Sequence, residues 1–211
     1  YEQAIRDCNQ QADGRYRINY VRLPTDANQQ CELIVRRLAA EDDTVDLVGM
    51  DVIWTAEFAE AGWILPWEGE QREAAEEGRL EGPLATVTYE GEVWAAPFTS
   101  NTQLLWYRRD RVDDPPEDFT WDEMIDDAVQ QGRDIEVQGR QYEGLTVWVN
   151  ALIESAGGQI VNDEGDVVVD DTARTAAEII RKLARSPAAP PGLATNAEDD
   201  ARLGFESGRS N

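Results

Sequence analysis

Helix-like and strand-like segments alternate through the first third of this chain, and that order constrains its fold more than any other feature. Apolar spacing predicts helices over residues 1–13, 28–41 and 55–63, with strands over 16–23 and 45–54 between them. Such alternation is typical of an α/β fold in which helices cover both faces of a parallel sheet. We therefore expect a doubly wound lobe that lacks its first strand.

The rest of the chain carries turn and cap signals that divide it further. A Glu-Gly turn predicts a hairpin over 89–98, and another strand is expected at 103–108. The polar run 111–118 contains two prolines and is the predicted boundary between two lobes. After it, Thr120 and Glu123 have the spacing of a helical capping box. The remaining predicted elements are a short surface helix within 66–91, helices over 142–156 and 171–185, a hairpin over 159–169 and an irregular connector over 186–197.

Asp51 and Trp54 stand at the end of the apolar run 45–54, directly before a predicted helix. In an open α/β sheet, ligands are held where strands end and helices begin. A carboxylate accepts hydrogen bonds from hydroxyl groups, and an indole face covers the apolar C–H patches of a sugar ring. The two residues therefore suit a sugar site. Asp51 equally suits the role of a helix-capping acid, and Trp54 equally suits that of a buried core residue.

Four further side chains are candidates for the same site. Gln30 opens a helix near the predicted strand ends, and Asn101 lies between the hairpin and the strand at 103–108. Tyr142 and Glu143 open a helix after the boundary, where they can offer a stacking face and an acceptor. The alternatives are an exposed helix residue for Gln30, a turn residue for Asn101 and an acid placed at the helix dipole for Glu143. Trp148, on the same helix, is expected to pack in the core.

Composition excludes several classes of function. The chain has no histidine, which removes Ser-His-Asp and Cys-His catalysis, and a net charge of −24, which opposes nucleic acid and anionic lipid as partners. No nucleotide-binding glycine motif and no long apolar run is present. Cys8 and Cys31 are too few for a thiolate zinc site, and whether they pair is left open. We therefore expect no cofactor, no metal and no membrane span.

Two non-receptor functions fit parts of the sequence. Asp51 with Glu57, or Glu143 with Glu154, could serve as the acid and base of a glycoside-processing enzyme. With 43 acidic residues in the chain, however, such pairs arise by chance. The acidic residues are spread along the chain, which also fits an acidic scaffold that binds no small ligand.

An ordered set of segments resembles the extracellular solute-binding proteins of family 1, which serve carbohydrate ABC importers. Within that family the chain is most similar to the trehalose-binding lipoproteins of actinobacteria. The segments cover nearly the whole chain, and no single one of them is decisive. They are Asp46-Leu-Val-Gly-Met-Asp-Val-Ile-Trp-Thr-Ala-Glu-Phe-Ala-Glu-Ala-Gly-Trp-Ile-Leu-Pro, Gly91-Glu-Val-Trp-Ala-Ala-Pro-Phe, Asn101-Thr-Gln-Leu-Leu-Trp-Tyr-Arg-Arg-Asp, Phe119-Thr-Trp-Asp-Glu-Met, Gln138-Gly-Arg-Gln-Tyr-Glu-Gly-Leu-Thr-Val and Ser155-Ala-Gly-Gly-Gln-Ile.

The resemblance implies a periplasmic-binding-protein-like fold of two α/β lobes that close on a sugar. It divides the chain into an incomplete N-terminal lobe over 1–110, a hinge over 111–118 and the first, mostly helical part of the C-terminal lobe over 119–211. It implies a neutral di- or oligosaccharide ligand, delivered to ABC permease subunits without chemical change. The implied ligand contacts are Gln30, Asp51 and Asn101, together with Trp54, Tyr142 and Glu143.

Members of this family are about twice as long, so the resemblance also implies a fragment that lacks the first strand and the C-terminal half. The remaining C-terminal segment of the same protein is then a partner of this chain. The implied location is extracellular, with a lipid anchor on the outer face of the cytoplasmic membrane and a targeting signal outside these residues.

Overall fold

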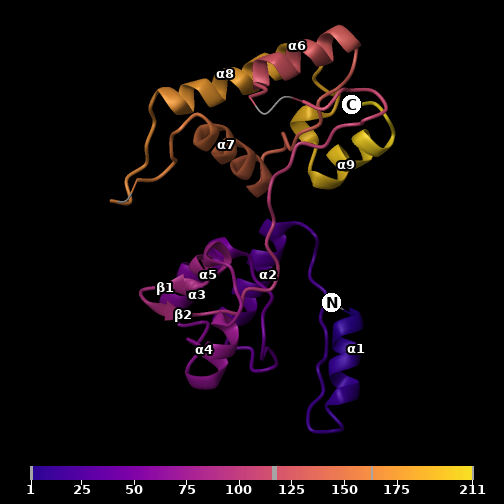
Figure 1. Ribbon diagram of the computed structural model, residues 1–211. Coiled ribbons are helices and arrows are strands. Elements are labelled where there is room, and N and C mark those ends of the chain that lie inside the picture. Colours follow the sequence, from indigo (N-terminus) through magenta and orange to yellow (C-terminus); the bar gives the residue numbers. More distant parts are fainter. Residues whose placement is uncertain (1, 116–117, 163, 211) are drawn as a thin grey trace. The chain divides into compact units, whose positions relative to one another are not determined.

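The computed structural model describes residues 2–115, 118–162 and 164–210, and it divides into two compact units, residues 1–102 and 103–211 (Figure 1). The division lies upstream of the predicted 111–118 boundary, and residues 116–117 of that boundary fall outside the described residues. A hinge at 111–118 therefore remains a prediction. Each unit is described by itself below.

Helices in unit 1 begin and end where local signals place them. Helix α2 (Ala27–Ala39) starts at Asp26, whose carboxylate accepts a hydrogen bond from the Gln29 backbone N–H at 3.1 Å. Helix α1 ends before Gly14, which has the positive φ of 78° that favours glycine at such positions. The other helices of this unit are α1 (Glu2–Gln11), the short 3₁₀ helix η1 (Val52–Trp54), α3 (Thr55–Glu60), α4 (Gly69–Glu76) and α5 (Glu81–Thr86).

The predicted hairpin in unit 1 is confirmed. Strands β1 (Thr88–Tyr89) and β2 (Glu92–Val93) pair antiparallel, with Thr88 opposite Val93. The two turn residues, Glu90 and Gly91, have φ values of 50° and 81°, as a two-residue hairpin turn requires. Val93 is buried with Ala75 and Val87, so the hairpin packs against α4 and the end of α5.

Unit 2 is mainly helical. Thr120 caps α6 (Trp121–Gln131) through the predicted box, in which its hydroxyl accepts from the Glu123 backbone N–H and the Glu123 carboxylate accepts from the Thr120 backbone N–H. Helix α8 packs against both α6 and α7, and Trp148 and Leu183 are buried in the core that they share. The remaining elements are α7 (Glu143–Ser155), α8 (Asp171–Arg185), the 3₁₀ helix η2 (Leu193–Thr195) and α9 (Glu198–Glu206), which the sequence analysis did not predict.

The strands predicted over 16–23, 45–54 and 103–108 do not form, and this corrects the expectation of a parallel sheet within the described residues. The only sheet there is the β1–β2 hairpin, accompanied by isolated bridges between Asp134 and Ser210 and between Val161 and Val167. A strand exists only when a neighbour accepts and donates its backbone hydrogen bonds, so apolar patterning alone does not make one. Residues 45–50 and 103–107 have no assigned secondary structure and pair with no strand of the described residues.

The contribution of the Thr120–Glu123 capping box to the stability of unit 2 can be tested by mutation. Thr120→Ala removes the hydroxyl that accepts from Glu123, so we expect the free energy of unfolding to fall by about 1 kcal/mol. Chemical denaturation followed by far-UV circular dichroism measures the change. The matched control is Thr146→Ala, an exposed threonine within α7, which should not lower stability because alanine is the better helix former. Equal losses in both variants would show that the box contributes nothing.

Candidate functional site

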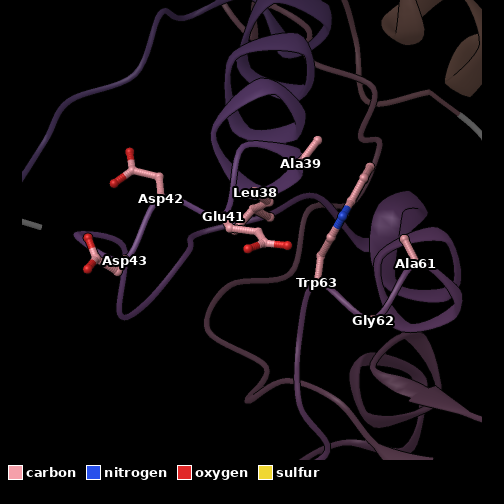
Figure 2. Close-up of a pocket in the computed structure, with 8 residues that line it drawn as sticks. All are labelled: Leu38, Ala39, Glu41, Asp42, Asp43, Ala61, Gly62 and Trp63. Carbon is pink, nitrogen blue, oxygen red and sulfur yellow. The ribbon is translucent and has the colours of Figure 1, made fainter.

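The C-terminal ends of α2 and α3 meet at an open depression of about 410 Å³ (Figure 2). Leu38 and Ala39 line it from α2, and Ala61 and Gly62 line it from the end of α3. The two helices also share a core cluster that contains buried residues of both.

Gln30 and Asp51 each lie at the start of a helix in unit 1. Gln30 is half-buried in the first turn of α2, and its backbone N–H donates to the Asp26 carbonyl at 3.0 Å. Asp51 caps η1, because its Oδ1 accepts from the Ile53 backbone N–H at 3.3 Å. No described residue donates to the other carboxylate oxygen of Asp51. The Asp51 side chain therefore caps η1 with one carboxylate oxygen and offers the other to a ligand as a hydrogen-bond acceptor.

Trp54 does not present a face to a ligand in the described structure. Its side chain is only 5% exposed, and its ring stacks on Phe58 with centroids 5.9 Å apart. Trp54 thus has the packing role that the sequence left open, and a contact of its ring with a ligand stays a prediction. The apolar surface beside Asp51 comes instead from Val52 and Ile53, which are both exposed. Sequence reasoning missed these two, although they directly follow the acid.

Asn101 is exposed near the end of unit 1. No hydrogen bond of its side chain to another described residue is found. An exposed amide can donate to one hydroxyl and accept from its neighbour, so Asn101 keeps the chemistry that was predicted for it.

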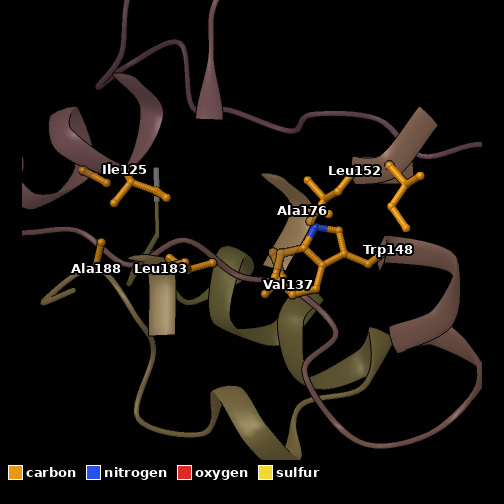
Figure 3. Close-up of a cluster of buried hydrophobic side chains, with 9 residues drawn as sticks. Ile125, Val137, Trp148, Leu152, Ala176, Leu183 and Ala188 are labelled. Atoms are coloured by element: carbon orange, nitrogen blue, oxygen red, sulfur yellow. The ribbon is translucent and has the colours of Figure 1, made fainter. Parts of the chain in front are cut away.

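Tyr142 and Glu143 lie in unit 2, at the start of α7. The Arg140 guanidinium sits over the Tyr142 ring at 4.4 Å from its centroid, so one ring face is already covered. The Tyr142 hydroxyl is buried, and burial, together with the neighbouring Glu198 carboxylate, raises the pKa of this phenol. Glu143 is the half-buried first residue of the helix, as expected for an acid placed at the helix dipole. Further along α7, Trp148 packs in the core of the unit as predicted (Figure 3).

A buried carboxylate in unit 2 is a feature that sequence reasoning did not find. The Glu136 side chain is 5% exposed, accepts from Asn196 Nδ2 at 3.2 Å and lies 3.4 Å from Arg209 Nη2. Burial raises the pKa of Glu136 above its usual range, and the nearby Arg209 opposes that shift. These contacts tie the end of the described chain to the segment after α6, so we assign the cluster a structural role.

The depression at the C-terminal ends of α2 and α3 carries three acidic residues on the loop after α2, with Trp63 across from them (Figure 2). Asp42 accepts from the Thr44 hydroxyl and backbone N–H and forms an ion pair with Arg37 at 2.7 Å. None of the six candidate ligand residues lines this depression. It is therefore separate from the candidate site, and its Asp42 holds the loop to the last turn of α2 through Arg37.

Asp42 makes the stability of this loop depend on pH. The hydrogen bond from the Thr44 hydroxyl and then that from Arg37 lower the pKa of Asp42 from 3.8 to about 2. Because the folded-state pKa is depressed, the ionised group stabilises the fold above about pH 4, and that contribution is lost as the pH falls towards 2. We expect Asp42→Asn to be less stable than the wild type at pH 7 and the difference to vanish near pH 2.

Thermal denaturation across this pH range measures the Asp42 effect. Asp43→Asn is the matched control, because Asp43 lines the same depression and makes none of these contacts. A gap between wild type and Asp42→Asn that is the same at both pH values would contradict the assignment.

The described residues contain no cluster of three or more His, Cys, Asp or Glu side chains that could hold a metal ion. Cys8 and Cys31 are both free thiols, exposed and half-buried respectively. No described helix combines the length and apolar character needed to cross a membrane.

Comparison with known proteins gives one consistent result. Residues 9–210 match the family described as bacterial extracellular solute-binding protein. A relative from Deinococcus radiodurans, described as a probable ABC transporter-binding protein, is 26% identical over 234 residues, covering 99% of this chain and 54% of the relative. The structure of maltose-bound T. maritima MalE3 is similar with a TM-score of 0.81 and 26% identity, covering 99% of this chain and 55% of that one. The chain spans about half the length of these two proteins.

Proposed function

Because this chain belongs to the bacterial extracellular solute-binding protein family, we propose that it forms part of the binding component of a carbohydrate ABC importer. The observation that carries the proposal is the family match, which runs through almost the whole chain from residue 9 to 210. The similarity to maltose-bound MalE3, at a TM-score of 0.81, supports both the periplasmic-binding-protein fold and a sugar as the class of ligand.

The proposed ligand is a neutral di- or oligosaccharide of the trehalose or maltose type. In unit 1, Gln30 in the first turn of α2, Asp51 at the start of η1 and Asn101 supply the polar contacts. Asp51 accepts from a sugar hydroxyl through the carboxylate oxygen that the cap leaves available. The exposed side chains of Val52 and Ile53 offer apolar surface beside it, and Trp54 supports the site from the core.

In unit 2, the proposed contacts are Tyr142 and Glu143 at the start of α7. Arg140 holds the Tyr142 ring from one side, which orients it before any ligand arrives. The ligand is bound and released without chemical change, then passed to the permease subunits of the importer. In this proposal the full-length protein is exported and held at the outer face of the cytoplasmic membrane by a lipid anchor.

A charge-removing variant at Asp51 tests the proposed contact. Asp51→Asn keeps an oxygen that can accept from Ile53, so the cap survives, whereas the charge-assisted bond to a sugar hydroxyl is lost. We expect the affinity of the full-length protein for its sugar to fall at least about tenfold, which is about 1.4 kcal/mol. The ligand-free melting temperature should stay within about 3 °C of the wild type because the cap is kept.

Isothermal titration with trehalose and with maltose gives the affinity, and a ligand-free thermal melt gives the stability. The control is Asp46→Asn, an exposed acid upstream of Asp51, which should leave affinity unchanged. If Asp51→Asn binds like the wild type, Asp51 is a cap alone. If it melts much lower without sugar, its role is structural.

A further inference from the structure

The backbone that leads into α7 is fastened to the stretch of chain that leads into α9. The Arg140 backbone N–H donates to the Asn196 carbonyl at 3.1 Å, and Asn196 Nδ2 donates to the Glu136 carboxylate at 3.2 Å. Asn196 is buried, and a buried amide is held in place by its hydrogen bonds. Asn196 therefore joins the two stretches just ahead of Tyr142.

The two stretches approach so closely that only glycine fits at one point between them. A Cβ atom on Gly139 would lie 2.1 Å from the carbonyl oxygen of Leu193, which is far inside van der Waals contact. The obstructing oxygen belongs to the backbone, so it cannot turn aside as the end of a flexible side chain could. The chain before α9 therefore packs directly against the backbone that carries Tyr142.

Glu198, the first residue of α9, reaches the Tyr142 hydroxyl itself. A Cβ atom on Gly144 would lie 2.2 Å from that hydroxyl oxygen and 2.9 Å from Glu198 Oε1, so the phenol and the carboxylate share the space above this glycine. The hydroxyl is buried, and the Glu198 carboxylate is the acceptor beside it. Burial raises the pKa of the Tyr142 phenol and the carboxylate raises it further, so the phenol keeps the proton that it can donate to Glu198.

The Tyr142 side chain is therefore held at two places by residues of unit 2. The Arg140 guanidinium lies over one ring face, 4.4 Å from the centroid, and Glu198 and Gly144 enclose the hydroxyl end. Tyr142 as a whole is only half-buried, so part of the ring stays accessible. Because a buried hydroxyl cannot contact a ligand directly, the part of Tyr142 that a ligand can reach is its ring.

We propose that Glu198 is a positioning residue for Tyr142, which holds the phenol end and so sets the place of the ring before a sugar arrives. This inference rests on Tyr142 as a ligand contact, which is part of the proposed function. A ring that is already in place loses little rotational freedom on binding, so its contact with the sugar yields a higher affinity. Glu198 does not touch the sugar and acts through Tyr142 alone.

A double-mutant cycle on the full-length protein tests this link, with affinity for trehalose and maltose measured by isothermal titration. We expect Glu198→Ala to weaken sugar binding about three- to tenfold, the range for immobilising one side chain on binding. Glu198→Gln should bind close to the wild type, because its amide oxygen still accepts from the phenol. In a Tyr142→Phe background, Glu198→Ala should weaken binding no further, since the hydroxyl through which it acts is gone.

Fluorine NMR of the ligand-free protein, labelled with fluorotyrosine, follows the Tyr142 ring independently of any sugar. The Tyr142 signal is the one that disappears in Tyr142→Phe. We expect Glu198→Ala to move this signal towards that of a solvent-exposed fluorotyrosine. The matched control is Asp199→Ala, which removes the next acid of the same helix start. Asp199 faces Arg202 at 3.3 Å instead, so this variant should change neither the signal nor the affinity.

A Tyr142 signal that Glu198→Ala leaves in place would overturn the proposal. So would the same loss of affinity from Glu198→Ala with and without the Tyr142 hydroxyl, because Glu198 would then act elsewhere. If the wild type binds neither sugar, the proposed function fails, while the fluorine signal still decides whether Glu198 holds the ring. If the Glu198→Ala protein does not fold, Glu198→Asp takes its place, since its shorter side chain keeps the charge at the helix start and withdraws it from the phenol.

Discussion

Phe58→Ala is expected to remove a large part of the stability of unit 1. Phe58 is fully buried and packs between two indoles, stacked on Trp54 at 5.9 Å and edge-on to Trp63 at 5.5 Å between centroids. Emptying such a position costs about 3–5 kcal/mol, since the burial of the ring is lost and a cavity remains. Domains are commonly stable by only about 5–15 kcal/mol, so the variant is left close to its unfolding threshold.

Urea denaturation followed by near-UV circular dichroism measures this loss, because the signal reports on the packed indoles. Leu65→Ala serves as the control, at an exposed aliphatic position of the same unit, and should change stability by no more than about 0.5 kcal/mol. A Phe58→Ala protein within about 1 kcal/mol of the wild type would show that α2, η1 and α3 do not depend on this core.

Trp148→Ala is expected to have a similar effect in unit 2. The indole is buried in the cluster formed by α6, α7 and α8, where Figure 3 shows it with Ala176 and Val137. Its ring also lies 6.0 Å from that of Trp121. Loss of this side chain should cost about 3–5 kcal/mol, the range for a large aromatic residue in a core.

Trp148→Phe separates packing from hydrogen bonding at the same position. The indole N–H is buried and has no acceptor among the described residues, so replacing it with a phenyl ring forfeits no hydrogen bond. We expect this variant to lose less than about half as much stability as Trp148→Ala. Equal losses in a denaturant titration of both variants would mean that the N–H has a partner that the structure does not show.

The helices of this protein were largely predictable because their signals are local. Helix α8 spans residues 171–185 as predicted, with Asp170 accepting from the backbone N–H groups of Thr172 and Ala173. The capping box at Thr120 and the Glu-Gly turn of the hairpin were likewise confirmed. Each of these depends on residues within a few positions of one another. Helix α9 was missed, because the sequence analysis followed the chain only as far as the connector that ends at residue 197.

The strands could not be predicted in the same way, because their partners are distant. Leu104 and Trp106 have the apolar character of a buried strand, yet both are exposed and their backbone is unpaired. Periodicity predicts that a segment is able to pair, and a neighbouring strand decides whether it does. A parallel sheet therefore could not be established from residues 16–23, 45–54 and 103–108 taken alone.

The chemical groups of the candidate site could be predicted from the sequence, but the directions in which its side chains point could be predicted less well. Asp51 has an acceptor oxygen available and Asn101 is exposed, as a ligand contact requires. Trp54 and Asp51 are three residues apart, yet the indole enters the core while the carboxylate caps η1. Tyr142 was predicted as a stacking face, but Arg140 already covers one side of its ring. Spacing along the chain did not determine which way these side chains point.

Titration of the full-length protein with trehalose and maltose, with the sugar recovered afterwards, tests the central claim most directly. The account predicts saturable binding of at least one of the two sugars in a single site, accompanied by an increase in melting temperature, and recovery of the sugar unchanged. Absence of binding to either sugar, or recovery of hydrolysed sugar, would contradict it.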